Sequence, residues 1–223
     1  SLSIFCFSAA VSAQNKNDEK RNVKQPPSLM VFNESQPYSL QNSSQIFKEA
    51  LKISNETSFI TLNQETDELG FIHQKMQQYY KGVKVEFGTV VLHSKEGVVK
   101  SMSSEFYQIN DLNVIPTLSN SQAFNKAVAH IGAQHYMWEY PDAAKEMDNY
   151  KKPVGELVVL PDFASAQNIK EINSYRLAYK FDMFATYPLS RGYLYIDAKN
   201  GQALFYDAII KQATDFGYVG TVK

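Results

Sequence analysis

Cysteine is nearly missing from this sequence, because Cys6 is the only one among 223 residues. A single thiol forms no disulfide within the chain and no cysteine-based metal site. Cys6 also lies in an apolar start that we expect to be removed. Phe5, directly before it, is too large for the small-residue cleavage box of a lipoprotein. The mature chain is therefore expected to carry no thiol.

An excess of one charge is missing as well. The chain has 22 basic and 23 acidic residues and a net charge of -1. Such a chain has no strong positive electrostatic field that would attract phosphate backbones or anionic lipids, so nucleic acid is not expected as a partner. Its 44% hydrophobic residues are ordinary for a globular protein of one large or two small domains. The 14 Tyr and 14 Phe, against one Trp, favour strands.

The motifs of common catalytic sites do not occur. There is no His-Glu pair, and so no H-E-x-x-H arrangement to bind zinc and activate water. There is also no G-x-S-x-G elbow, P-loop or G-x-G-x-x-G turn. We therefore expect no catalytic residue, no cofactor site and no metal site in this chain.

The four histidines fall into two pairs. His130 and His135 are five residues apart, which turns them away from each other on a helix, so a joint metal site is not expected. Both are expected on a helix surface. His73 and His93 lie in separate predicted strands and could meet across a sheet. For two strand histidines, cross-strand packing or a surface position is favoured over metal binding.

Other polar and aromatic residues have ordinary structural interpretations. Asp182, Asp197 and Asp207 stand near the ends of predicted strands, where turn or edge positions are favoured over paired acid-base chemistry. The Tyr79-Tyr80 pair and the aromatic residues at 193–195 are expected in a core or in cross-strand pairs rather than as ligand platforms.

The start of the chain resembles a secretory signal. Residues 1–13 are uncharged and mostly apolar, and they end in small residues, so we expect cleavage between Ala13 and Gln14. The run is too short to span a membrane, which takes about 20 apolar residues. An exported chain, extracellular or periplasmic and free of the membrane after cleavage, is therefore expected. Residues 14–36 are polar and contain Pro26-Pro27, which indicates a flexible leader.

The next part of the chain predicts one helix and four strands. Apolar residues recur at helical spacing over 42–53, with Asn42 or Ser43 as the N-cap and Gln45 as its capping partner. Short junctions containing glycine then separate extended segments that alternate between apolar and polar residues, which predicts an antiparallel meander. The expected strands are 58–64, 70–80, 83–94 and 97–109.

A second series of elements follows residues 110–117, which interrupt the pattern at Pro116 and form a candidate boundary. Ser119 and Gln122 form a capping box for a helix that is expected to reach about Tyr136. Residues 140–153 resemble a long loop, and 199–201 a hairpin turn. The expected strands are 156–161, 174–185, 192–198 and 202–210.

Each half of the chain thus has one helix followed by several strands. A helix laid across a curved antiparallel sheet buries the apolar faces of both. We therefore expect an α+β fold of two lobes, residues 37–112 and 113–210, each with a helix packed on a curved antiparallel β-sheet.

The stretch from Leu69 to Phe106 resembles the propeptide of the thermolysin and fungalysin families (FTP). There the pattern is a Gly, a strand of the His-x-Arg type, Gln-x-Tyr-x-Gly-Val-Pro-Val, and a second strand ending near a His. Lys84 stands where the family commonly has Pro, and Lys75 where it has Arg. The matching residues are Gly70, His73, Gln78, Tyr80, Gly82, Val83, Val85, Gly88 and His93.

The second half resembles the PepSY-like region of the same propeptides, whose pattern is Leu-Ala-Tyr and then Tyr-x-Ile-Asp-Ala-x-x-Gly. The resemblance makes residues 37–112 an FTP-like lobe and 113–210 a PepSY-like lobe with a cystatin-like fold. The matching residues are Leu177, Ala178, Tyr179, Tyr195, Ile196, Asp197, Ala198 and Gly201.

The resemblance implies a propeptide, not an enzyme. Such a propeptide binds its own protease catalytic domain in cis, assists its folding and blocks its zinc cleft until it is cleaved. Zinc, with calcium as a further candidate, is expected in that catalytic domain, and a monomer is expected here. Residues 214–223 resemble a worn Gly-rich start of a mature thermolysin-like domain, which places processing between Ala208 and Phe216 and makes residues 211–223 the expected junction to the catalytic domain. The segment expected to face the cleft is Tyr206, Asp207, Ala208, Ile209, Ile210, Lys211, Gln212, Ala213, Thr214 and Asp215.

Two alternatives remain open at this point. The chain could be a free-standing secreted module of the PepSY or cystatin type that binds a ligand or inhibits peptidases in trans. It could also be an independent hydrolase, which predicts turnover of a chromogenic substrate by the purified chain. An H-E-x-x-H motif encoded beyond Lys223 would favour the precursor.

Overall fold

The computed structural model describes residues 27–33, 37–165 and 174–210. Its α-helices are α1 (Ser43–Ala50), α2 (Asn120–Ile131) and α3 (Pro141–Glu146), and its 3-10 helices are η1 (Leu40–Asn42), η2 (Met137–Glu139) and η3 (Phe163–Ser165). The strands are β1 (Leu29–Val31), β2 (Tyr38–Ser39), β3 (Thr57–Thr66), β4 (Phe71–Tyr80), β5 (Val83–Lys95), β6 (Val98–Glu105), β7 (His135–Tyr136), β8 (Glu156–Pro161), β9 (Tyr175–Tyr187), β10 (Leu189–Asp197) and β11 (Ala203–Ile210).

All of these strands belong to one curled sheet, and the expected pair of lobes, each a helix on its own sheet, is wrong. The decisive contact is a parallel pairing of β5 with β8, in which Lys84 lies opposite Val158 and Val85 opposite Val159. Alternation within a strand predicts its two faces but does not reveal a partner more than 70 residues away along the chain. The result is a mainly β structure rather than two separate α+β units.

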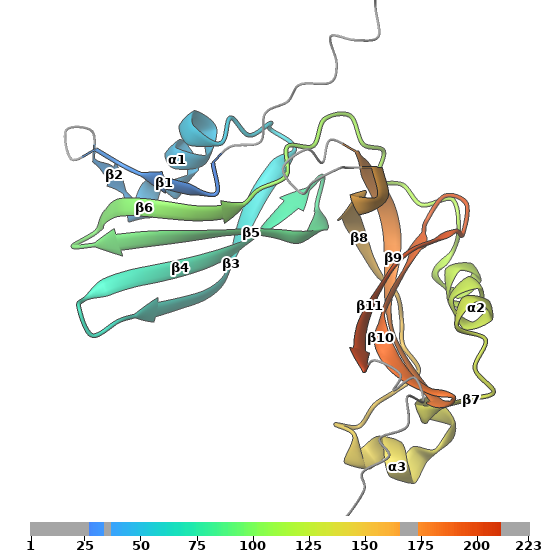
Figure 1. Cartoon of the computed structure of the whole chain (residues 1–223). Coiled ribbons are helices and arrows are strands. Elements are labelled where there is room, and N and C mark those ends of the chain that lie inside the picture. Colours follow the sequence, from blue (N-terminus) through green and yellow to red (C-terminus); the bar gives the residue numbers. More distant parts are fainter. Residues whose placement is uncertain (1–26, 34–36, 166–173, 211–223) are drawn as a thin grey trace, which may run out of the picture.

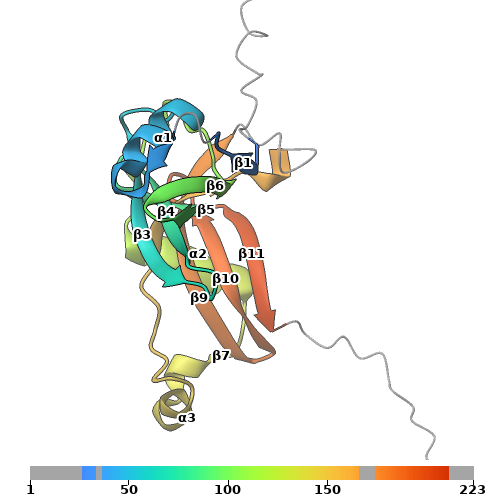
Figure 2. The ribbon, with the colours of Figure 1, turned by 90° about the vertical axis from the view of Figure 1, so that its left-hand side faces the viewer.

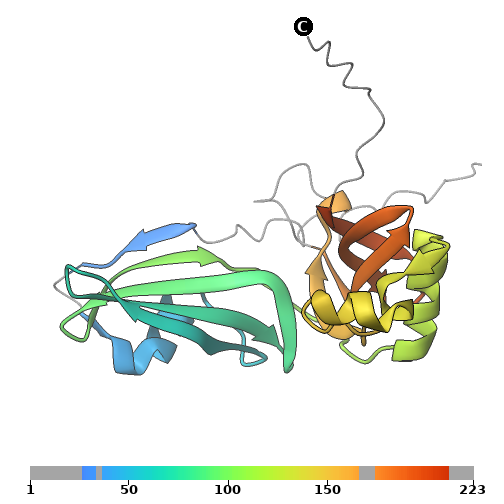
Figure 3. The same cartoon turned by 90° about the horizontal axis from the view of Figure 1, so that it is seen from below.

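β5 has a bend where its pairing changes from β8 to β6. Phe87 lies at this point with φ of 63°, a left-handed conformation that is uncommon for a residue other than glycine. The buried amide of Gln77 donates hydrogen bonds of 2.7 Å to the carbonyls of Val85 and Gly88 and so fills the irregularity. We call β1–β6 the first half of the sheet and β7–β11 the second half. Figures 1 and 3 show them side by side at a steep angle.

The first half is the antiparallel meander that its sequence predicted, in the order β3-β4-β5-β6. α1 covers one face of it, and Ile46 and Phe47 pack there against Val90, Leu92 and Met102. The helix is shorter than predicted, because it begins after η1 and ends at Ala50. The predicted strand 97–109 also ends early, at the end of β6.

In the second half, α2 packs on β9 and β10, on the side away from the first half (Figures 1 and 3). The predicted capping box of Ser119 and Gln122 is confirmed at its start. The prediction that this helix reaches Tyr136 is wrong, because Gly132 is left-handed at φ of 63° and ends it. His135, expected on the helix, lies in β7 instead.

Two further segments differ from the sequence analysis. The expected loop 140–153 contains α3, a helix of six residues that begins at Pro141 and is too short to give a periodic pattern. β1 lies inside the expected leader 14–36 and pairs with β6. The expected cleavage position at Ala13 and Gln14 and the junction 211–223 lie outside the described residues. No helix among the described residues is long and apolar enough to span a membrane.

Candidate functional site

The face of the first half opposite α1 carries side chains that remain partly or fully exposed. The pairing of β4, β5 and β6 places His73, His93 and Ser101 in one row across it. Leu29 and Val31 of β1 lie at its edge, 60% and 78% exposed. We call this surface the open face; it consists of Leu29, Val31, His73, Lys75, Val91, His93, Ser101 and Ser103.

A chain of four polar side chains crosses the open face. Nδ1 of His73 lies 2.7 Å from Nδ1 of His93. The outer nitrogen of each ring has its own partner: Nε2 of His73 lies 3.0 Å from Oδ2 of Asp67, and Nε2 of His93 lies 2.9 Å from Oγ of Ser103. The two histidines that the sequence analysis allowed to meet across a sheet therefore do meet.

The charges of this polar chain follow from its surroundings. Burial, and after it the neighbouring His73, lowers the pKa of His93 below the ordinary histidine value, which favours a neutral ring at neutral pH. The hydrogen bond from His73, and after it the backbone N–H of Phe71, lowers the pKa of Asp67. Asp67 is therefore an ionised acceptor for His73.

Several residues of β4 and β5 that match the propeptide-like sequence pattern stabilise the fold. The side chain of Gln78 is fully buried, donates to the carbonyl of Tyr107 at 2.6 Å and accepts from its N–H at 3.0 Å. Gly88 lies directly beside it, because an added Cβ would be 2.8 Å from the Gln78 Oε1 atom. Tyr80 is buried and donates to Glu56 at 2.7 Å.

The remaining pattern residues of the first half form its turns and its core. Gly82 has φ of 78° in the two-residue turn between β4 and β5, and Gly70 has φ of 80° in the turn before β4. Such angles favour glycine. Val85 is fully buried and Val83 is half-buried, in the core between β5 and β8.

A buried ion pair joins the two halves. Glu86 of β5, 5% exposed, accepts hydrogen bonds from Nζ of Lys180 at 2.6 Å and from the hydroxyl of Tyr195 at 3.0 Å. Burial alone would raise the pKa of Glu86, but Lys180, Lys84 and Tyr195 outweigh it and the pKa is lowered. Burial, and after it Glu86, raises the pKa of Tyr195. The sequence alone did not predict this pair, because Glu86 occupies a polar position in an alternating strand.

The pattern residues of the second half are also structural. Asp197, 1% exposed, forms an ion pair with Arg176 and accepts from the N–H groups of Lys199 and Asn200 at 2.7 and 3.1 Å. It thereby shapes the hairpin turn in which Gly201 has φ of 78°. The hydroxyl of Tyr179 donates to the Leu118 carbonyl at 3.0 Å. The core of this half includes Leu177, Ala178, Tyr195, Ile196 and Ala198.

The expected cleft-facing segment is described only as far as Ile210. Tyr206 to Ile210 lie in β11, which among the described strands pairs with β10 alone and forms an edge of the sheet (Figure 2). Asp207 and Ile209 are exposed there. Residues 211–215 lie outside the described residues.

The remaining histidines and Asp182 do not form a comparable cluster of polar side chains. His130 is exposed on α2, and His135 Nδ1 lies 3.3 Å from Glu139. Asp182 is paired with Arg191. Within the described ranges, no group of three or more His, Cys, Asp or Glu side chains is placed to hold a metal ion.

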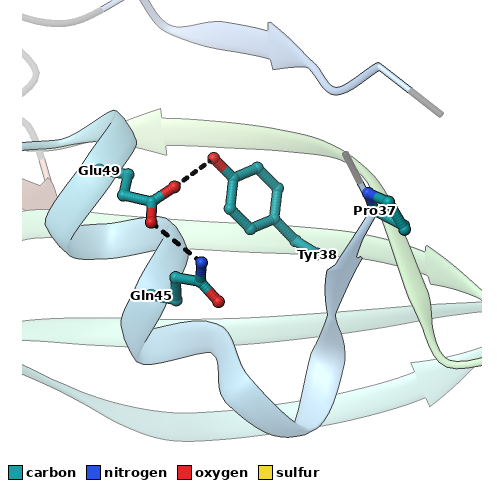
Figure 4. Close-up of a pocket in the computed structure, with 4 residues that line it drawn as sticks. All are labelled: Pro37, Tyr38, Gln45 and Glu49. Carbon is teal, nitrogen blue, oxygen red and sulfur yellow. Dashed lines mark hydrogen bonds between the residues drawn. The ribbon is translucent and has the colours of Figure 1, made fainter. Parts of the chain in front are cut away.

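A pocket between β2 and α1 is lined by Pro37, Tyr38, Gln45 and Glu49 (Figure 4). Tyr38 and Gln45 donate to the two carboxylate oxygens of Glu49 at 2.7 and 2.9 Å. The only charged group that lines the pocket is thus already bound by its neighbours.

Comparison with known families gives a match to part of the first half. Residues 57–106 match the Fungalysin/Thermolysin Propeptide Motif. This confirms the resemblance to thermolysin- and fungalysin-type propeptides, and the matched range begins with β3 and ends directly after β6. The motif is that of a propeptide and not of a catalytic domain. Gln78, Gly88 and the His73–His93 pair therefore all belong to the propeptide motif.

Two further comparisons add little to the propeptide motif. No curated protein matches the chain. Among solved structures, the C-terminal domain of YpeB from Bacillus megaterium is similar at 15% identity and a TM-score of 0.38, over 83% of this chain and 73% of that one.

Proposed function

We propose that this chain is the propeptide of a secreted thermolysin-like zinc metalloprotease, and that it assists the folding of its own catalytic domain and inhibits it until cleaved. The observation that carries this proposal is the propeptide motif over β3–β6. Zinc, with calcium as a further candidate, would belong to the catalytic domain. The partner is that domain in cis, and the chain itself acts as a monomer outside the cytoplasm.

The physical basis of the inhibition is tethering. A segment joined covalently to its partner experiences an effective concentration on the order of millimolar, and cleavage of the junction removes that advantage. β11 suits this role, since it is an edge strand that leads directly into the expected junction. An edge strand presents unpaired backbone groups that an extended segment can bind.

The test combines the purified chain with the peptidase domain encoded in the same precursor. We expect stoichiometric binding, inhibition of peptide hydrolysis, and a higher yield when the denatured peptidase domain refolds in the presence of the chain. Bovine serum albumin at equal concentration serves as the control for nonspecific protection. Neither binding nor inhibition, together with an unchanged refolding yield, would overturn the proposal.

The same experiment separates the alternatives. Inhibition of unrelated peptidases with no preference for the encoded one would favour a free-standing inhibitor. Hydrolysis of a chromogenic peptide by the chain alone would favour an independent hydrolase. Reading the gene beyond Lys223 for an H-E-x-x-H motif with a further Glu ligand gives an independent check.

A further inference from the structure

We propose that His73 and His93 bind a divalent transition-metal ion on the open face, with Asp67 and Ser103 holding the two imidazole rings in place. The inference concerns the isolated chain and does not depend on the protease partner. It differs from the sequence expectation, which favoured packing or a surface position for both histidines.

Two ring nitrogens of the histidine pair lie close together on the open face. His73 and His93 are direct cross-strand partners on β4 and β5, and their rings are steeply inclined with centroids 5.0 Å apart. The two Nδ1 atoms face each other at 2.7 Å. Two nitrogens that ligate one tetrahedral zinc ion at about 2.0–2.1 Å lie roughly 3.3 Å apart. A small rotation of either side chain therefore opens the pair enough to admit an ion.

Asp67 determines which nitrogen of His73 carries a proton. An ionised carboxylate only accepts hydrogen bonds, so Nε2 of His73 must carry the proton of that bond. In a neutral ring, Nδ1 then presents its lone pair toward His93. Asp67 is itself held by the N–H groups of Leu69 and Phe71 at 2.9 and 2.8 Å. A carboxylate on the outer nitrogen of a ligating histidine is a recurrent feature of metal sites.

Ser103 allows His93 to bind a metal ion without any net change in the number of bound protons. With both rings neutral and no metal bound, the proton on Nε2 of His73 leaves Nδ1–H of His93 as the donor across the 2.7 Å contact. The Ser103 hydroxyl is then the donor to Nε2 of His93 across 2.9 Å. On metal binding, the His93 proton moves from Nδ1 to Nε2 by exchange with water, and Ser103 becomes the acceptor. Both Nδ1 atoms then carry lone pairs toward the ion, and every proton is accounted for.

The residues around His73 and His93 determine which metal ions can bind and how tightly. The protein supplies two nitrogen ligands, and the side chain of His73 is 35% exposed, so water completes the coordination. Imidazole suits Zn²⁺, Ni²⁺ and Cu²⁺, whereas Mg²⁺ and Ca²⁺ prefer oxygen ligands. Asp67 and the cross-strand neighbour Glu65 place carboxylates nearby, while Lys75 adds a positive charge to the same face. Binding weaker than at a closed four-ligand site is therefore expected.

The test is a titration of the full chain at slightly alkaline pH with ZnCl₂, NiCl₂ or CuCl₂, and with MgCl₂ as the control salt. Calorimetry is expected to give one ion per chain for the transition metals and no binding for Mg²⁺. Saturating the chain with a transition-metal ion is expected to raise its thermal unfolding midpoint, because the ion binds the folded state.

Matched variants locate the site. His73→Gln and His93→Gln are each expected to lose binding at least tenfold. The double variant His130→Gln/His135→Gln is expected to keep it, because these are the other two histidines of the chain. Asp67→Asn is expected to weaken binding roughly 10- to 100-fold, as loss of a partner of a ligating histidine does. Circular dichroism and metal-free unfolding midpoints show which variants remain folded.

A spectroscopic readout keeps the test decisive if a variant folds poorly. In the unaltered chain, imidazole ¹⁵N spectra are expected to show Zn²⁺ on Nδ1 of two rings and a proton on their Nε2 atoms. Three results would overturn the proposal: no transition-metal binding, binding that survives loss of both His73 and His93, or Zn²⁺ shifts confined to His130 and His135.

Discussion

The carboxylate of Glu86 accepts a hydrogen bond from the Tyr195 hydroxyl at 3.0 Å, although 109 residues separate them along the chain. Lys180 completes the contact at 2.6 Å, with its Nζ also 4.2 Å from the centre of the Tyr193 ring. A cation and an anion are thus held together in a buried position where the two halves of the sheet meet.

Removing one partner of this pair is expected to destabilise the chain. Glu86→Ala leaves the ammonium group of Lys180 buried without its counter-ion, which costs about 3 kcal/mol of unfolding free energy. The control is Glu156→Ala, since Glu156 is half-exposed and contributes a surface pair with Lys84 worth about 0–1 kcal/mol. Urea unfolding followed by circular dichroism measures both, and equal losses for the two variants would contradict this account.

The same carboxylate predicts how stability depends on pH. Because the folded-state pKa of Glu86 is lowered, its contribution is fully present above the unfolded value near 4.3 and is lost as the pH falls through the folded pKa. We expect the unfolding free energy to decrease as the pH is lowered from about 5. The slope of unfolding free energy against pH is expected to be smaller in Glu86→Gln. Urea midpoints across a pH series measure this, and identical slopes in the two proteins would exclude Glu86 as the cause.

Gly88 and Gln78 are expected to be energetically coupled. Gly88→Ala places a methyl group 2.8 Å from the Gln78 Oε1 atom and strains the bonds to Tyr107, at a cost of roughly 1–3 kcal/mol. In a Gln78→Ala background the oxygen is gone, so the same change is expected to cost less. A double-mutant cycle from urea unfolding measures the coupling, and strictly additive effects would show that the close approach relaxes freely.

The edge strand β11 gives a test of the proposed inhibition. Ile209 and Val154 are both exposed, at 50% and 83%, so replacing either with Lys leaves the core intact. If β11 approaches the protease, Ile209→Lys is expected to weaken inhibition in trans about tenfold, which corresponds to 1.4 kcal/mol. Val154→Lys, the matched control, is expected to leave the inhibition constant unchanged. Equal inhibition by both variants would place the protease contact elsewhere.

The parts of the fold that the sequence predicted are those with local causes. Alternating residues and the Gly82 turn predicted β4 and β5, and the Ser119 capping box predicted the start of α2. The parallel pairing of β5 with β8 has no local signal, so the sequence analysis divided one sheet into two lobes. The helical period also ran past Gly132, whose left-handed angle ends α2.

The candidate site was predicted from the sequence only in part. His73 and His93 could be placed in strands that meet, because their spacing fits neighbouring strands of a meander. Their partners could not be named, since Asp67 reads as an ordinary turn residue and Ser103 as a polar strand residue. Glu86 and Lys180 were missed, because burial of a charged residue depends on tertiary packing that a strand pattern does not contain.

β5 takes part in both halves, because its first residues pair with β8 and its later residues with β6. A single cut within Val83–Lys95 would therefore remove hydrogen bonds from both halves at once. Because both halves of the sheet share this strand, cleavage within it is expected to destabilise the first and the second half together.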